Sequence, residues 1–228
     1  MDGWGRVTTA ERILGIDEAG RGSLIGPLVV GAFCISSDRL EDLTVLGAKD
    51  SKALTPEARE RVYDGLARLG TRAHVALAPR TVDSSVVRGK LNVLEVETFA
   101  RLIRQLDPDV AYVDACDTNQ WRFGLRVGRL VGARVRVVAR HHADRDYPIV
   151  GAASIVAKVR RDRALARLRE VLGADLGSGY PSDSKTLKFV REALASRTAP
   201  PSWVRCSWTT MQGVKPHRPA RTLESFEP

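Results

Sequence analysis

Apolar residues in the first third of the chain gather into three short runs, at positions 12–17, 27–35 and 72–78. Runs of this length, bounded by glycine and polar residues, predict strands. Because the stretch Gly20-Arg21-Gly22-Ser23 separates the first run from the second, we expect these two strands to pair as an antiparallel ribbon. Two later apolar runs predict strands at residues 110–113 and 134–139.

Helical spacing of apolar residues follows the strands and predicts helices near residues 56–69, 92–106, 119–130 and 148–172. Thr55 and Pro56 suit the N-cap and the first position of the first of these helices. In the second helix, Asn92 followed three residues later by Glu95 has the spacing of a capping box. Strands first, and then strands alternating with helices, indicate an α/β fold in which helices flank a mixed five-stranded sheet.

The composition of the chain changes near residue 177. Ser, Gly, Pro, Lys and Arg dominate from there on, with Trp203 and Trp208 as isolated large apolar residues. We therefore predict a main α/β domain in residues 1–176, a small C-terminal helical appendage in residues 177–211 and a flexible tail in residues 212–228. A chain of 228 residues can bury one good-sized core with such an addition.

The overall composition is that of a chain that folds without help, with 43% hydrophobic and 28% charged residues. No apolar run resembles a signal peptide or reaches the twenty residues or so of a membrane span. We expect a monomeric, cytoplasmic protein without membrane contact. Cys34, Cys116 and Cys206 are far apart and form no C-x-x-C pair, which argues against a zinc site and against a disulfide framework.

The chain is strongly basic, with a net charge of +9 and an isoelectric point of about 9.9. Of its 36 basic residues, only seven are Lys and the other 29 are Arg. A basic surface favours a polyanionic partner, because each neutralised phosphate releases counterions. An Arg-rich genome that uses Arg wherever Lys would serve explains the same numbers, so charge alone does not decide the partner.

Four acidic residues stand at or just after predicted strand ends: Asp17 and Glu18 after the first strand, Asp114 after the fourth and Asp144 beyond the fifth. Ligand sites of α/β sheets lie at such ends. Four neighbouring carboxylates stay ionised only if cations neutralise them. Hard oxygen ligands suit Mg²⁺ or Mn²⁺. Each carboxylate taken singly would be interpreted as a solvated or capping group, but the four together predict a metal site.

Neighbouring residues of a strand point to opposite faces, and this raises a difficulty for Asp17 and Glu18. Both can reach one site only if the chain turns there or if Glu18 bends back on its longer side chain. Gly20 and Gly22 make such a turn feasible.

Seven segments, in order, resemble ribonuclease HII: G-I-D-E-A-G-R-G with I-G-P-L-V-V-G-A (15–32), K-D-S-K-A-L-T-P (49–56), Y-V-D-A-C-D (112–117), H-H-A-D-R-D-Y-P (141–148), A-A-S-I-V-A-K-V-R-R-D (152–162) and G-S-G-Y-P-S-D (177–183). The forms Y-V-D-A-C-D and A-D-x-x-Y-P are most similar to the archaeal branch. The resemblance spans residues 11 to about 210 and implies a ribonuclease H-like fold for the main domain. Ser23 departs from it, since the family often has Pro there, and could leave the turn slightly looser.

The resemblance implies an endonuclease that hydrolyses the RNA strand of RNA–DNA hybrids and cuts 5′ of ribonucleotides embedded in duplex DNA. Asp17, Glu18, Asp114 and Asp144 would hold two divalent cations, Mg²⁺ or Mn²⁺, with Asp17 bridging both. Two such ions roughly 4 Å apart can activate a water and neutralise the transition state, so that 3′-hydroxyl and 5′-phosphate ends form. Asp146 lies two residues from Asp144, but counting back from Ala152 favours Asp144.

Substrate contacts follow from the same resemblance. The main chain of Gly20-Arg21-Gly22 would contact the ribose 2′-hydroxyl, and Tyr180 would stack on the next sugar. Without the resemblance, these glycines would be interpreted as a plain tight turn and Tyr180 as a half-buried core ring. Ser51, Lys52 and Lys158 are candidate phosphate contacts.

The last residues, Arg221-Thr222-Leu223-Glu224-Ser225-Phe226, resemble the C-terminal peptide by which replication enzymes bind a sliding clamp. Leu223 and Phe226 would share one side of a single helical turn and fill an apolar pocket. Ala220 and Glu227 depart from that motif, where Gln and a second aromatic residue are usual. A free tail is the alternative.

Two other functions compete with this interpretation. A structure-selective DNA endonuclease on the same fold, such as a junction resolvase, would share the carboxylates but would have no use for the glycine turn with Tyr180. A non-catalytic hybrid-binding protein would be expected to have lost carboxylates, and this chain has all four.

Overall fold

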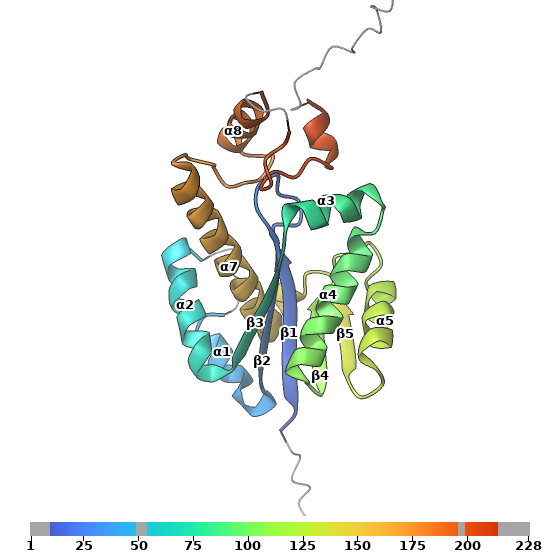
Figure 1. Ribbon diagram of the computed structural model, residues 1–228. Coiled ribbons are helices and arrows are strands. Elements are labelled where there is room, and N and C mark those ends of the chain that lie inside the picture. Colours follow the sequence, from blue (N-terminus) through green and yellow to red (C-terminus); the bar gives the residue numbers. More distant parts are fainter. Residues whose placement is uncertain (1–9, 49–53, 196–198, 214–228) are drawn as a thin grey trace, which may run out of the picture.

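The computed structural model describes residues 10–48, 54–195 and 199–213 (Figure 1). Its centre is a five-stranded sheet of order β3-β2-β1-β4-β5. The strands are β1 (Arg12–Ala19), β2 (Leu28–Ser36), β3 (Thr71–Leu77), β4 (Val110–Asp114) and β5 (Arg136–Arg140). β2 pairs antiparallel with both β1 and β3, whereas β4 runs parallel to β1 and to β5. The predicted mixed five-stranded sheet and the antiparallel ribbon are therefore confirmed.

Helices cover both faces of the sheet (Figure 1). On one face lie α1 (Leu40–Val45), α2 (Pro56–Leu69) and α7 (Pro148–Leu172), and on the other lie α4 (Leu91–Leu106) and α5 (Gln120–Val131). Successive residues of β1 point to opposite faces of the sheet: Ile13 packs toward α2 and α7, and Leu14 packs toward α4 and α5. A strand buried on both faces has no polar alternation, which explains why its sequence is a continuous apolar run.

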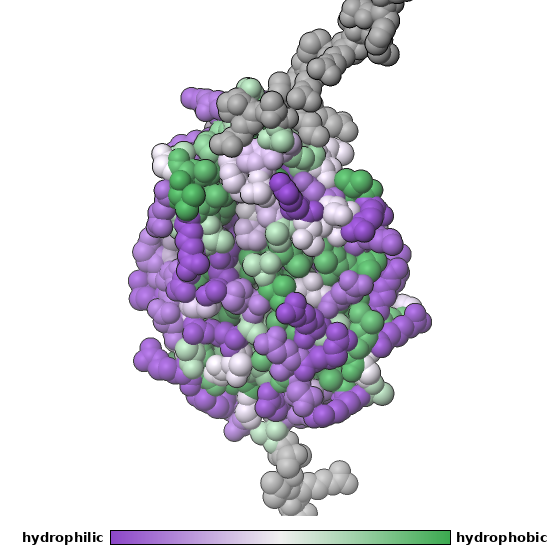
Figure 2. Space-filling model, viewed as in Figure 1, coloured by the Kyte–Doolittle hydropathy of each residue, from purple (hydrophilic) through white to green (hydrophobic). Residues whose placement is uncertain are grey.

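The remaining elements are short: α3 (Pro79–Val87), α6 (Ala143–Asp146), α8 (Ser184–Ala195) and the 3₁₀ turns η1 (Ser37–Arg39) and η2 (Thr209–Gly213). On the face seen in Figure 2, hydrophilic residues are abundant and hydrophobic residues show between them. Across the described ranges, no helix combines the length and the apolar character that crossing a membrane requires.

The start of α2 is as the sequence predicts, because the Thr55 side chain accepts a hydrogen bond from the Ala58 N–H at 3.2 Å and Pro56 is the first helical residue. The capping box predicted for α4 is wrong. That helix begins at Leu91, and its N-cap residue makes no side-chain capping bond. Asn92 and Glu95 have partners elsewhere in the fold, and the local spacing could not show this.

Residues after α7 form a small apolar cluster with earlier parts of the chain. Val190 of α8, Val204 and Met211 pack with Leu165 of α7 and with the β1–β2 loop, where Ile25 forms an isolated bridge with Val204. The predicted boundary at residue 177 falls between α7 and α8, and the segment beyond it is packed against the loop that follows β1.

Candidate active site

Three carboxylates meet at one end of the sheet. Asp17 comes from β1, Asp114 is the last residue of β4, and Asp144 lies on α6 directly after β5. Because these three strands are parallel neighbours, their carboxyl ends share one edge of the sheet. One oxygen of each carboxylate lies within 4.8 Å of the others, and Asp17 and Asp144 are buried.

Burial and mutual repulsion both raise pKa values within this group. Burial, and next the charge of Asp114, raise the pKa of Asp17 to about 7. Burial and the charge of Asp144 raise the pKa of Asp114, although main-chain groups of Ala143 and His142 form hydrogen bonds with it. His142 has a left-handed backbone with φ of 57°, at the turn into α6. Three close carboxylates, two of them buried and one partly buried, offer hard oxygen donors that fit divalent cations such as Mg²⁺ or Mn²⁺.

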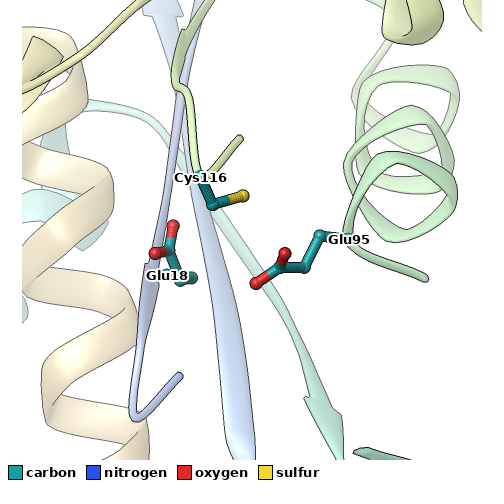
Figure 3. A group of neighbouring side chains, drawn as sticks. All are labelled: Glu18, Glu95 and Cys116. Atoms are coloured by element: carbon teal, nitrogen blue, oxygen red, sulfur yellow. The ribbon is translucent and has the colours of Figure 1, made fainter. Parts of the chain in front are cut away.

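Glu18 is not a member of this group and lies beside Glu95 of α4 and Cys116 after β4 (Figure 3). Ligand atoms of Glu18, Glu95 and Cys116 lie within 4.8 Å of one another. The cause is strand geometry, since Asp17 and Glu18 are consecutive residues of β1 and point to opposite faces. Burial and then the charge of Asp17 raise the pKa of Glu18, so the two groups of acids are electrostatic neighbours. A metal role for Glu18 stays a prediction.

The glycine bend, residues 20–22, directly follows β1. Gly20 has φ of +83°, and a Cβ there would lie 2.6 Å from Nε of Arg161, so glycine is required. A Cβ at Gly22 would meet nothing within 4 Å, which leaves the main chain open to an approaching ligand. Ser23 tightens the bend, because its hydroxyl donates to the Gly20 carbonyl at 3.0 Å.

The Arg21 side chain is held by the two residues of the wrongly predicted capping box. Its Nε donates to Oε1 of Glu95 at 2.8 Å, and its Nη2 donates to Oδ1 of Asn92 at 2.8 Å. Glu95 is fully buried. Burial and, as the second cause, the charge of the nearby Glu18 carboxylate strongly raise the pKa of the Cys116 thiol. This cysteine is therefore neutral beside Glu18 and Glu95.

One pocket of about 500 Å³ joins these parts; it is lined by Asp17, Glu18, Ala19, Gly20, Arg21, Gly22, Arg59, Asp114, Ser154, Lys158 and Tyr180. Most of the residues singled out in the sequence therefore line a single cavity. Tyr180 comes from the loop after α7, and the Arg161 guanidinium lies 4.4 Å from the centre of its ring. Ser51 and Lys52 lie outside the described residues.

Two cationic side chains lie at the wall of this pocket. Lys158 Nζ is 2.7 Å from Oδ1 of Asp162, and Arg59 Nη1 is 3.4 Å from Oδ2 of the same carboxylate. Arg59 also donates to the Leu54 carbonyl at 2.9 Å. No local sequence pattern distinguishes Arg59, because it is one of 29 arginines and lies on an amphipathic helix.

Comparisons with known proteins show which family the chain resembles. The family model described as ribonuclease HII matches residues 14–211. The chain is 45% identical to the ribonuclease HII of Cenarchaeum symbiosum over 214 residues, 93% of this chain and 98% of the relative. It is 40% identical to that of Pyrococcus abyssi, with 94% and 97% covered.

Solved structures give the same picture. The PCNA:RNase HII complex from Archaeoglobus fulgidus matches with a TM-score of 0.82 and 38% identity, covering 90% of this chain and 98% of that one. Ribonuclease H2 from Pyrococcus horikoshii matches with a TM-score of 0.82 and 36% identity, covering 90% and 97%. The predicted ribonuclease H-like fold is confirmed.

Proposed function

Since the chain belongs to the ribonuclease HII family and is therefore an endoribonuclease acting on the RNA of RNA–DNA hybrids, we propose that it also cuts 5′ of single ribonucleotides embedded in duplex DNA, leaving 3′-hydroxyl and 5′-phosphate ends. The observation that carries this proposal is the pocket in which Asp17 and Asp114, two members of the three-carboxylate group, adjoin the glycine bend and Tyr180. Hydrolysis and recognition of a ribose can thus take place on one nucleotide.

Asp17, Asp114 and Asp144 would hold two divalent cations, Mg²⁺ or Mn²⁺, because one oxygen of each lies within 4.8 Å of the others and their mutual charges oppose ionisation. When bound, such cations activate a water and stabilise the charge of the phosphodiester as it is cut. Glu18 adjoins this group, and a change of its side-chain torsion angles would turn its carboxylate toward the same cations. The protein's own part is to fix these oxygens at the ends of three adjacent strands.

Recognition would come from the glycine bend and Tyr180, which line the same pocket. The main chain of the glycine bend is accessible at Gly22 and can form hydrogen bonds with a 2′-hydroxyl, the group that distinguishes RNA from DNA. Tyr180 would stack on the sugar that follows, with its ring orientation supported by Arg161. Lys158 would contact the phosphate backbone, and Arg59 adds a second positive charge beside it.

A direct test compares a DNA duplex that contains one ribonucleotide with its all-DNA twin, in Mg²⁺ and again in Mn²⁺. We expect a single cut on the 5′ side of the ribonucleotide and no cut in the twin. Equal cleavage of the two duplexes would favour a DNA endonuclease on the same fold. Binding to hybrid without any cleavage would favour a non-catalytic hybrid-binding protein.

We further propose that the C-terminal tail binds a sliding clamp through Leu223 and Phe226, which lie outside the described residues. Support comes from the relative of Archaeoglobus fulgidus, whose solved structure is a complex with PCNA, and from the clamp-like spacing of the two apolar residues. Replacing both by Ala should weaken binding to a PCNA-type clamp by at least about 10-fold, since both would be buried anchors.

Calorimetric titration of the clamp with the full-length chain would measure this difference, with Ser225→Ala as the matched control. Cleavage of a short duplex in the absence of clamp should be the same for all three proteins. Unchanged clamp affinity in the double variant would show that the tail is free.

A further inference from the structure

Arg205 connects the C-terminal segment to the glycine bend through a single buried guanidinium. The side chain is fully buried, and its Nη1 donates to the carbonyls of Gly20 at 2.7 Å and Arg21 at 2.9 Å. Its Nε donates to the Gly26 carbonyl at 3.0 Å. One planar group thus contacts three carbonyls of the β1–β2 loop, which the shape of arginine permits and that of lysine does not.

The main chain of Arg205 is fixed independently of its side chain. Its N–H donates to the Leu24 carbonyl at 2.8 Å. Next along the chain, Asp83 of α3 accepts hydrogen bonds from the N–H groups of Cys206 at 2.8 Å and Ser207 at 3.1 Å. The guanidinium therefore reaches the bend from a segment whose main chain is hydrogen-bonded both to the β1–β2 loop and to α3.

Peptide planarity converts these contacts into an orientation of the bend. In a trans peptide the C=O of one residue and the N–H of the next lie in one plane and point in opposite directions. The Gly20 and Arg21 carbonyls turn inward to Arg205, so the N–H groups of Arg21 and Gly22 turn outward. Within the described part of the chain, these two N–H groups donate to no other group.

We propose that Arg205 is a positioning residue that holds the Gly20 and Arg21 carbonyls inward and so presents the N–H groups of Arg21 and Gly22 to a ribose 2′-hydroxyl in the pocket. This inference rests on the proposed function and deepens it. It makes the C-terminal segment part of the recognition apparatus, although among the described residues after Tyr180 none lines the pocket.

The proposed positioning role explains why the charged side chain of Arg205 is buried. A buried guanidinium without a carboxylate in contact is costly. Burial and the neighbouring Arg161 lower the pKa of Arg205 to about 10, whereas the charge of Asp83 opposes this change. An apolar side chain could fill the same space, but it could not orient two consecutive peptide groups.

The test measures binding, so that it does not depend on the chemical step. Asp17→Asn is the parent, and its dissociation constants are measured in Mg²⁺ for a duplex with one ribonucleotide and for the all-DNA twin. We expect the parent to prefer the ribonucleotide. Adding Arg205→Met should reduce this preference about 10-fold, the effect of roughly one lost hydrogen bond, and Arg205→Lys should reduce it less.

Arg12→Met is the matched control. Arg12 also donates from a guanidinium to a main-chain carbonyl, that of Leu106 at 2.7 Å, but it lies at the opposite end of β1. It should keep the parent's preference. Thermal unfolding identifies folded variants, and Arg205→Lys alone decides the matter if Arg205→Met does not fold.

The possible results separate the two proposals. If the parent shows no preference for the ribonucleotide, the proposed recognition of ribose is wrong, and the role of Arg205 falls with it. If the parent shows the preference and the folded Arg205 variants keep it within twofold, the role of Arg205 is overturned while the proposed function stands.

Discussion

Asp114→Asn should lower the rate of cleavage at an embedded ribonucleotide by roughly 1000-fold, the equivalent of several kcal/mol of lost stabilisation by the cations. Asp114 ends β4, which lies between β1 and β5 in the sheet, and its charge raises the pKa of Asp17. Asn keeps the shape of the side chain and removes the charge that would bind a cation. Single-turnover kinetics on the ribonucleotide duplex would measure the loss, and binding to the same duplex should persist.

A matched control comes from α6. Asp146 is exposed and lies two residues after Asp144, outside the three-carboxylate group. Asp146→Asn should therefore keep the wild-type rate, while Asp144→Asn should lose as much as Asp114→Asn. Near-normal turnover in Asp114→Asn would refute the proposed metal site. Loss of activity in Asp146→Asn but not in Asp144→Asn would show that Asp146, and not Asp144, is the functional aspartate.

Chemistry and recognition have separate origins in this fold. The proposed cation ligands are fixed by parallel strands, whose ends the sheet places side by side. The proposed recognition groups lie in segments far apart in sequence: the loop after β1, the start of α4, the loop after α7 and the strand-like segment at Arg205. Relatives on the same sheet could thus change their substrate preference without altering the carboxylates.

The sequence predicted those features that depend on local or periodic patterns. The five strands, the four long helices and the convergence of strand-end acids all follow from runs of apolar residues and their order. The opposite orientation of Asp17 and Glu18 was also foreseeable, since it is a property of any strand. The structure adds the neighbours that Glu18 meets on its side, Glu95 and Cys116.

What the sequence could not supply are contacts between distant residues. Asn92 and Glu95 have capping-box spacing, yet both bind Arg21, which is more than 70 residues away along the chain. Arg59 and Arg205 carry no local signal in a chain with 29 arginines. Their roles depend on which carbonyls and carboxylates the fold brings to them. Short helices such as α1 and α3 were missed because one or two turns give too few periodic positions.

In the absence of divalent cations, the wild-type protein should lose stability relative to Asp17→Asn as the pH rises from about 4 to 7. The folded protein holds the pKa of Asp17 near 7, above the ordinary value of 3.8. Between these values the folded state binds a proton that the unfolded state has released, so raising the pH favours unfolding. The loss in free energy of unfolding is complete above pH 7, where it amounts to about 4 kcal/mol, and it is absent below pH 4.

Urea unfolding in EDTA, followed by circular dichroism at pH 4 and pH 8, would measure this difference for wild type, Asp17→Asn and the control Asp146→Asn. The raised pKa values of Glu18 and Asp114 act in the same direction, so the difference between proteins measures Asp17 together with its interaction with these neighbours. Mg²⁺ at pH 8 should stabilise wild type more than Asp17→Asn, because bound cations neutralise the buried charge and bind the folded state alone. Parallel pH dependence of wild type and Asp17→Asn would mean that the carboxylates are not in the repelling arrangement from which their affinity for cations is inferred.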